Sequence, residues 1–310
     1  MKLSIVTTLY QSEKTINEFH SLISKEAKKL VNLDYEIIYV NDCSPDQSLE
    51  ESIDIFNEDK QVKIIDLSRN FGHHKAMMTG LDYACGDFIF LIDIDLEEDP
   101  RYLSDFFSEI KKENCDVVYG KQKNRRGNWF DRISGTLFWK FFQIISGLPP
   151  NVNPSTIRIM TRRYVDALIL HKEREVFIYG IWAITGFVQK AYLIDKGTHS
   201  KTTYTLSKRI HLLVNSITSF SSLPLIAIFY IGLIILCISS VNVLFFLFQY
   251  FVKDISIEGW TSVIASIWLI GGLIITFMGI IAIYLSKIFI ETKNRPFTII
   301  KKEYTHSKIK

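Results

Sequence analysis

The stretch "FIFLIDIDLEEDP", residues 88–100, places a cluster of carboxylates directly after an apolar run. The run from Phe88 to Ile92 has the continuous apolar character of a strand that is buried on both faces, as in parallel sheets. Asp93 and Asp95 follow, and residues two apart in an extended chain point to the same side. Two such carboxylates repel each other unless a cation lies between them. The pair is therefore a candidate site for Mg²⁺ or Mn²⁺, with a solvated acidic turn as the alternative.

On either side of this stretch, short apolar runs alternate with segments of helical periodicity. The predicted strands are 3–10, 35–42, 62–68, 87–93 and 115–120, and the predicted helices lie near 14–31, 46–57, 73–84 and 100–112. This alternation predicts an α/β fold with a mostly parallel, Rossmann-like sheet that helices cover on both faces. The first strand is not followed by G-x-G-x-x-G, so an NAD-type dinucleotide fold is not expected.

Three of the predicted strands end in polar residues. They are Asn41-Asp42, Ser68-Arg69-Asn70 and Asp93-Ile94-Asp95. Ligands of open α/β sheets bind beyond the carboxyl ends of the strands. We therefore expect the three groups to border one crevice.

The last third of the chain has a different composition. Ile210–Val252 and Gly259–Ser286 contain no Asp, Glu, Lys or Arg. A bilayer crossing needs about 20 apolar residues of helix. We expect an interfacial amphipathic helix over 205–222 and a transmembrane hairpin over 223–290, with spans at about 224–251 and 261–288. A buried helix pair in a soluble protein is the alternative.

Charge predicts the orientation of this hairpin. The loop between the spans has one basic residue, Lys253, whereas the segment 291–310 is rich in Lys and Arg. The positive-inside rule places a basic tail, and with it the domain formed by residues 1–204, in the cytoplasm. "MKLSIVTTLY" resembles a strand more than a signal peptide. The four cysteines form no close pair, which fits reduced cytosol, and a net charge of +3 does not predict nucleic-acid binding.

Several blocks of the sequence resemble one family. They are "YEIIYVNDCSPDQSLE" (35–50), "LSRNFGHHKAMMTGLDYACGDFIFLIDIDLEEDP" (67–100), "TGFVQK" (185–190), "SITSFSSLPL" (216–225) and "NRPFTIIKKEY" (294–304). The chain resembles family 2 glycosyltransferases of the GT-A fold, of the dolichol-phosphate mannose synthase and bactoprenol glucosyltransferase type. The similarity covers nearly the whole chain.

The resemblance implies roles for the strand-end residues on the donor side. Asp42 would recognise the base or ribose of a nucleotide-sugar donor, and Arg69 would face the nucleotide or form a structural salt bridge. Asp93 and Asp95 would be catalytic residues that hold the metal, Mg²⁺ or Mn²⁺, and the donor diphosphate. Glu97 would be a third ligand of the metal.

Three positions depart from the family pattern. Asn41 stands where the first acidic residue of the second strand is common, and Cys43 replaces the usual glycine. Thr156, in "NPSTIRIM", aligns with an aspartate that is a candidate base or orienting residue in relatives. A simple copy of the relatives' mechanism is therefore in doubt.

The consequence depends on the acceptor. A sugar hydroxyl needs a base, for which Glu97 and Glu98 are the nearest candidates, whereas a lipid phosphate is already anionic and needs cationic positioning. Arginine and lysine suit a phosphate. The candidate acceptor-phosphate residues are Arg125, Arg126, Arg158 and Lys201, with Arg126 also a candidate catalytic residue.

We therefore expect a membrane-bound, metal-dependent, inverting hexosyltransferase that moves a sugar from a nucleotide diphosphate to polyprenyl phosphate at the cytoplasmic face. A hydroxyl of a lipid-linked saccharide is the alternative acceptor, and a non-catalytic membrane scaffold is a rival of another class. The sugar, the nucleotide and a homo-oligomeric state stay open.

Overall fold

The computed structural model describes residues 1–30, 34–122, 154–174, 176, 178–195, 218, 222–253 and 259–306 of the 310-residue chain. The chain divides into two compact units. The first comprises residues 1–209 and 295–310, and the second comprises 210–294. Each unit is described by itself below.

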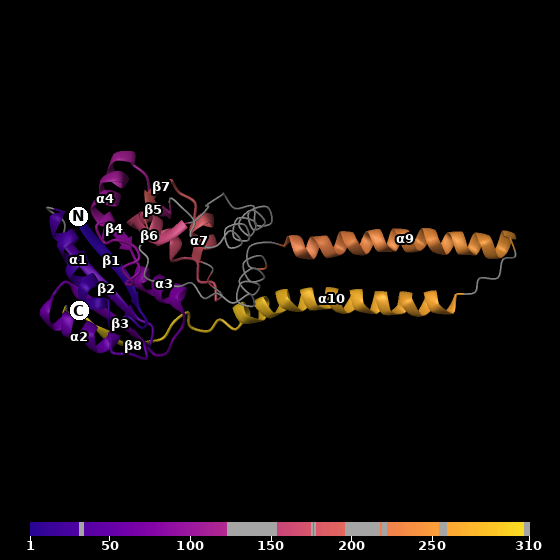
Figure 1. Cartoon of the computed structure of the whole chain (residues 1–310), viewed down its shortest axis with the longest axis horizontal. Coiled ribbons are helices and arrows are strands. Elements are labelled where there is room, and N and C mark those ends of the chain that lie inside the picture. Colours follow the sequence, from indigo (N-terminus) through magenta and orange to yellow (C-terminus); the bar gives the residue numbers. More distant parts are fainter. Residues whose placement is uncertain are drawn as a thin grey trace. The chain divides into compact units, whose positions relative to one another are not determined.

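An eight-stranded mixed sheet forms the centre of the first unit (Figure 1). Its strands are β1 (Lys2–Leu9), β2 (Asp34–Asn41), β3 (Val62–Leu67), β4 (Phe88–Leu91), β5 (Val117–Gln122), β6 (Pro154–Thr161), β7 (Gln189–Ile194) and β8 (Ile300–Tyr304), in the order β7-β5-β6-β4-β1-β2-β3-β8. β1 pairs in parallel with both β2 and β4, and β2 with β3. The carboxyl ends of these strands therefore meet at one edge.

Helices connect the strands. They are α1 (Ile16–Lys29), α2 (Ser48–Glu58), α3 (His73–Tyr83), α4 (Tyr102–Glu113), α6 (Arg162–Leu168) and α7 (Ile178–Ile184). Apolar side chains of α1 and α4 form the main core with Leu3, Ile5 and Phe90 of the sheet. α3 lies against β1 and β2. A Cβ on Gly80 of α3 would lie 2.5 Å from Val6 Cγ1 and 2.8 Å from Val40 Cγ2, so the helix can approach this closely only with glycine there.

The structure confirms the predicted α/β class with a mostly parallel sheet. Each predicted strand and helix of the first 120 residues is present within a few residues of its predicted limits. One prediction was wrong in detail, because the fourth strand ends at Leu91 and not at Asp93. The alternation of side chains along an extended strand therefore does not orient Asp93 and Asp95.

The segment after residue 294 returns to the sheet. β8 pairs antiparallel with β3 at the sheet edge, with Ile65 opposite Glu303. The backbone N–H of Ser68 donates to the carbonyl of Ile299 (2.9 Å), and Tyr83 of α3 donates to Glu303 (2.7 Å). The residues predicted to form a basic tail thus include a strand of the first unit.

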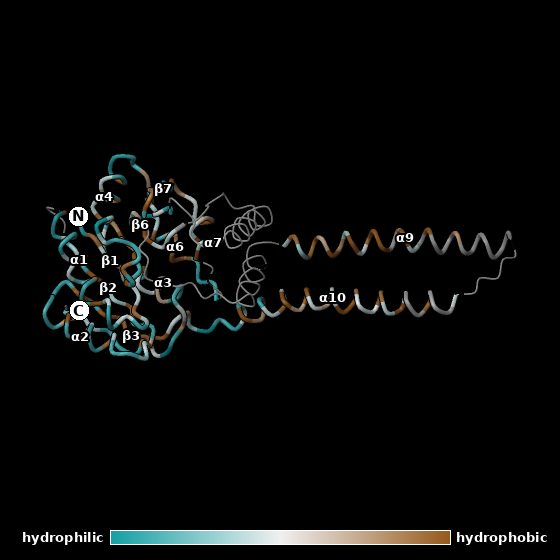
Figure 2. The backbone as a smooth tube through the Cα atoms, viewed as in Figure 1, coloured by the Kyte–Doolittle hydropathy of each residue, from teal (hydrophilic) through white to brown (hydrophobic). Residues whose placement is uncertain are grey.

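The second unit contains two long helices, α9 (Leu223–Lys253) and α10 (Trp260–Thr292), whose described parts are strongly apolar (Figure 2). Among the described residues, one helix is long and apolar enough to cross a membrane, over Ser266–Thr292. Within the described part of α9, the apolar stretch Leu223–Ser239 is shorter. The interfacial helix predicted over 205–222 falls almost entirely outside the described residues.

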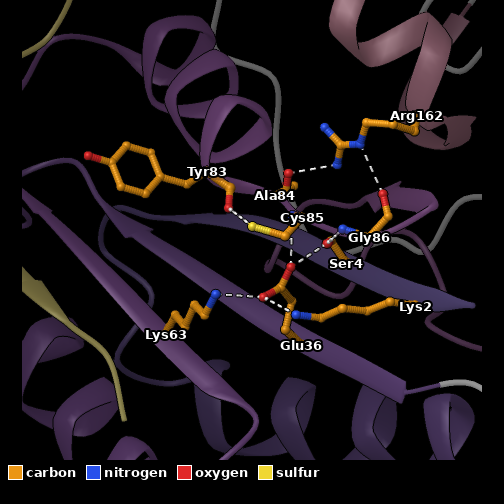
Figure 3. A network of polar contacts seen from close by, with 9 residues as sticks. All are labelled: Lys2, Ser4, Glu36, Lys63, Tyr83, Ala84, Cys85, Gly86 and Arg162. Atoms are coloured by element: carbon orange, nitrogen blue, oxygen red, sulfur yellow. Dashed lines mark hydrogen bonds and ion pairs between the residues drawn. The ribbon is translucent and has the colours of Figure 1, made fainter. Parts of the chain in front are cut away.

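A buried carboxylate joins the amino ends of the central strands (Figure 3). Glu36 of β2 is 2% exposed and accepts hydrogen bonds from Ser4 Oγ (2.6 Å), the Cys85 N–H (2.9 Å), Lys63 Nζ (2.7 Å) and Lys2 Nζ (3.0 Å). Burial disfavours the charged carboxylate, but these bonds outweigh it and lower the pKa of Glu36 to about 2. The network therefore connects β1, β2, β3 and the segment before β4.

We predict that this network makes the free energy of unfolding depend on pH in the acidic range. The folded pKa of about 2 lies below the ordinary value of 4.5, so the stabilisation is complete above about pH 5 and is lost as the pH falls from there toward 2. The shift corresponds to roughly 3 kcal/mol. Acid unfolding of the full chain, followed by fluorescence, measures it. Glu36→Gln should lower stability at pH 7 by about 2–4 kcal/mol and flatten the profile. Parallel acid profiles for the two proteins would contradict the prediction.

Candidate active site

The carboxyl ends of β1, β2 and β4 bring together residues that are far apart in sequence. Thr8 lies near the end of β1, Asp42 directly follows β2, and Asp93 lies two residues beyond β4. His73, the first residue of α3, contacts two of them: its Nδ1 is 3.0 Å from Thr8 Oγ1, and its Nε2 is 3.3 Å from Asp93 Oδ1. Asp42 and Asp95 also act on His73 through their charges, so side chains from these strand ends lie near one another.

Asp42 holds the turn that precedes α3. Its Oδ1 accepts from the Phe71 N–H (2.7 Å) and its Oδ2 from the Gly72 N–H (2.9 Å), and the residue is 2% exposed. Burial raises the pKa of Asp42 above its ordinary value, although the two backbone bonds act in the opposite direction. Its predicted contact with the nucleotide stays a prediction, and its visible role is to place the turn.

Arg69 is exposed at the same edge. Its guanidinium carbon lies 4.1 Å from the centre of the Phe71 ring, and its Nη1 donates to the Asn70 carbonyl (3.0 Å). Within the part of the chain that the structure describes, Arg69 forms no ion pair, so the salt bridge considered as its alternative role is not observed there. A cation stacked on an aromatic ring at this edge of the sheet has the charge to attract a phosphate.

The acidic turn after β4 carries Asp93 and Asp95. The Asp93 side chain is 20% exposed, and Asp95 is exposed, with its Oδ1 accepting from the Glu97 N–H (3.0 Å). Leu96, which follows Asp95 directly, has φ +58°. This left-handed backbone conformation is strained for leucine. Such strain is compatible with a turn that holds side chains at a functional site.

The nearby charges act on His73. Desolvation disfavours the imidazolium, but the hydrogen bond to Asp93 and the negative charges of Asp93, Asp42 and Asp95 outweigh it and raise the pKa of His73. His74 behaves oppositely: its pKa is lowered by burial, and its Nδ1 pairs with the Val176 carbonyl (3.0 Å). The adjacent histidines therefore have different environments, and it is His73 that faces the carboxylates.

The donor set fits a metal only in part. No group of three or more His, Cys, Asp or Glu side chains is arranged to hold a metal ion among the described residues. Glu97, which was predicted as a third ligand, is 8% exposed and not part of such a group. Asp93 and Asp95 alone could supply two carboxylates, which suits an ion whose remaining ligands are water and substrate phosphate.

The predicted acceptor residues are mostly outside the described part of the chain. Arg125, Arg126 and Lys201 lie there. Arg158 is described and is 1% exposed, stacked on Trp182 and donating to the carbonyls of Thr156 and Ser155 (both 3.3 Å). Burial lowers the pKa of Arg158 to about 10. Its position in β6 is interior, so the structure gives no support to a direct contact with an acceptor phosphate.

The position that the family pattern aligns with an aspartate is also described. Thr156 is 7% exposed and hydrogen-bonds to Tyr179, whose pKa is raised by burial and by the charge of Asp93. Glu98 is fully buried and accepts from Ser155 Oγ and from the Ile157 N–H (3.0 Å). Glu98, considered above as a candidate base, therefore holds the Ser155 side chain and the Ile157 backbone on the two sides of Thr156.

Sequence reasoning missed Thr8, His73 and Tyr179. His73 could have been found, because "FGHHK" directly follows the third strand end and begins a helix. Thr8 and Tyr179 carry no sequence signal, since a threonine in a strand and a tyrosine in an apolar segment are ordinary. Only the fold brings Thr8 to His73 and Tyr179 within the influence of the Asp93 charge.

Comparison with known proteins identifies the family. The model of glycosyl transferase family 2 matches residues 4–169, more than half of the chain. This region contains Thr8, Asp42, His73, Asp93 and Asp95, so most of the strand-end site lies within it. The chain belongs to glycosyl transferase family 2, and is thus a transferase by family.

Particular relatives extend over almost the whole chain. A Mycobacterium tuberculosis protein described as a glycosyltransferase is 44% identical over 304 residues, which cover 98% of this chain and 89% of that protein. The SfII prophage-derived bactoprenol glucosyl transferase of Shigella flexneri is 30% identical over 307 residues, covering 98% and 99%.

A solved structure is similar at a greater distance. Glucosyl-3-phosphoglycerate synthase from Mycobacterium tuberculosis, in complex with Mn²⁺ and UDP-glucose, has a TM-score of 0.48 and 15% identity, covering 70% of this chain and 77% of that one. This similarity is too weak to support any argument about the site.

We predict that Asp95→Ala lowers sugar transfer at least about a hundredfold, because Asp95 would help to hold a metal ion that neutralises charge on the departing diphosphate. The fold should survive, because the side chain is exposed. Steady-state transfer and the unfolding temperature measure the two effects. Asp105→Ala, an exposed aspartate on α4, is the matched control and should change neither. More than about a tenth of the wild-type rate in saturating Mg²⁺ or Mn²⁺ would refute a direct role for Asp95.

Proposed function

We propose that the protein is a membrane-bound, inverting glycosyltransferase that transfers a sugar from a nucleotide diphosphate to polyprenyl phosphate at the cytoplasmic face. One observation carries the choice of acceptor. At Thr156, where relatives have a candidate base, the described residues offer a buried hydroxyl paired with Tyr179. The neighbouring carboxylate, Glu98, is engaged with the backbone and with Ser155.

This arrangement suits an acceptor that brings its own negative charge. A sugar hydroxyl attacks only if a positioned base takes its proton. The phosphate of a polyprenyl phosphate is ionised near neutral pH, so its oxygen can attack the anomeric carbon without proton transfer. The bond from that carbon to the donor phosphate breaks as the new bond forms, and the nucleoside diphosphate leaves.

The residues at the strand ends have donor roles in this proposal. Asp93 and Asp95 would hold Mg²⁺ or Mn²⁺, which when bound would neutralise charge on the donor diphosphate. Arg69, exposed and stacked on Phe71, would contact the nucleotide. Asp42 would support this site by fixing the turn at Phe71 and Gly72.

The path of the chain supports two membrane crossings. The residues before the second unit and β8 after it belong to the same unit, and β8 is a strand of the same sheet. The chain must therefore leave and return on one side of the membrane, which requires an even number of crossings. With α10 able to span, α9 would supply the second crossing. The Shigella flexneri relative, named as acting on bactoprenol, favours a polyprenyl acceptor.

We predict that the purified full chain glycosylates polyprenyl phosphate. The measurement incubates it with a panel of nucleotide sugars and either polyprenyl phosphate or a polyprenyl-diphosphate sugar, followed by mass analysis of the lipids. Product on the monophosphate, absent with Asp95→Ala and present with Asp105→Ala, is expected. Turnover confined to the second acceptor would instead assign the protein to hydroxyl glycosylation. Absence of turnover with either acceptor and of metal-dependent donor hydrolysis would favour the scaffold.

We predict that the hairpin loop is extracytoplasmic and the C-terminus cytoplasmic. In a variant lacking the four native cysteines, an impermeant thiol reagent should label a cysteine at Ser256 in intact cells. A cysteine at Ser307 should react only after permeabilisation, because β8 belongs to the same unit as the sheet. Protection of both positions in intact cells would contradict two crossings, and the reverse pattern would contradict the orientation.

A further inference from the structure

Three elements of the fold meet in a chain of hydrogen bonds at the carboxyl ends of the strands. Thr8 comes from β1, His73 from the start of α3, and Asp93 from the turn after β4. The imidazole lies between the other two side chains, with Thr8 Oγ1 3.0 Å from Nδ1 and Asp93 Oδ1 3.3 Å from Nε2. The imidazole of His73 therefore connects Thr8 to Asp93.

The chemistry of imidazole sets the direction of this chain. A neutral imidazole has one N–H donor and one lone pair. When Nε2–H donates to the Asp93 carboxylate, Nδ1 can only accept, so the Thr8 hydroxyl donates to it. The Asp93 carboxylate thereby sets the tautomer of His73, and the hydrogen bond to Thr8 fixes the plane of the ring. A valine at position 8 would keep the shape of the side chain and lose this hydrogen bond.

A second hydroxyl–imidazole–carboxylate chain occurs elsewhere in the fold. His20 of α1 lies with Nδ1 3.0 Å from Tyr39 Oη and Nε2 3.5 Å from Asp59 Oδ2. Its side chain is 18% exposed, compared with 48% for His73. Tyr39 lies within β2 and Asp59 directly follows α2, so this chain connects helix and sheet away from the strand ends. A hydroxyl–imidazole–carboxylate chain can thus have a purely structural role. The chain at His73 differs from the chain at His20 in its location at the carboxyl ends of the strands.

We propose that Thr8 and His73 are positioning residues that orient the Asp93 carboxylate for the metal-bound diphosphate of the donor. Asp93 is partly exposed and lies in a turn beyond the end of β4, where the backbone ladder no longer fixes it. His73 supplies that constraint from a helix start which Asp42 holds through the preceding turn. The proposal rests on the donor role of Asp93 in the proposed function, and it does not depend on the acceptor.

The test measures binding, so that it needs no acceptor. Calorimetry gives the affinity of the full chain for UDP, GDP, CDP and dTDP, each with and without Mn²⁺, and the tightest is used for the variants. His73→Ala should weaken Mn²⁺-dependent binding about ten- to a hundredfold, and Thr8→Val about three- to tenfold. His73→Gln, which can still donate to Asp93, should recover part of the loss. Binding without Mn²⁺ should change little.

A double variant separates positioning from general destabilisation. If Thr8 acts through His73, Thr8→Val should have no further effect once His73 is alanine. His20→Gln is the matched control for the loss of an imidazole between a hydroxyl and a carboxylate, and should lower the unfolding temperature without changing Mn²⁺-dependent affinity.

Three outcomes would overturn the inference: multiplicative effects of Thr8→Val and His73→Ala, equal weakening by His20→Gln, or unchanged Mn²⁺ dependence in His73→Ala. Wild-type protein that binds none of the nucleotides with Mn²⁺ would overturn both this inference and the proposed function. Intact binding effects without transfer to polyprenyl phosphate would overturn the proposed acceptor alone.

Discussion

Two backbone hydrogen bonds to the Asp42 carboxylate determine where α3 begins, and much of the site depends on them. The N–H groups of Phe71 and Gly72 would otherwise lack these partners, and Gly72 adopts φ +97°, which favours glycine. Because the turn is fixed, His73 begins the helix within reach of both Thr8 and Asp93. One buried carboxylate thus connects the ends of three neighbouring strands, and its burial raises its pKa as a consequence.

The amino ends and the carboxyl ends of the central strands carry carboxylates in different environments. At the amino ends, Glu36 collects two lysines, a serine and a backbone N–H, and its low pKa reflects a charge that is fully paired. At the carboxyl ends, the Asp93 side chain is partly exposed, Asp95 is exposed, and both lie in a strained turn. The two ends of the strands therefore place carboxylates in different environments, one buried and the other open to solvent.

Buried polar contacts surround Thr156. Glu98 accepts from the side chain of Ser155 and from the backbone N–H of Ile157, the two neighbours of Thr156. Arg158, two residues on, is buried against Trp182 and also donates to this segment. Position 156 therefore offers a buried hydroxyl in a segment that these contacts hold, and the proposal of an anionic acceptor rests on this arrangement.

The sequence by itself determined the order of strands and helices in the first 120 residues, the convergence of Asp42, Asp93 and Asp95, and the apolar C-terminal segments, because periodicity and strand-end polarity are local. Tertiary structure alone decided the rest. β6 inserts antiparallel between β4 and β5, and β8 returns to β3 across the whole of α9 and α10. Arg158 and Glu98 are buried in the folded protein. The packing of α3 against the sheet places His73 next to Thr8. Such pairings join residues far apart in the chain, and no local pattern encodes which partners will meet.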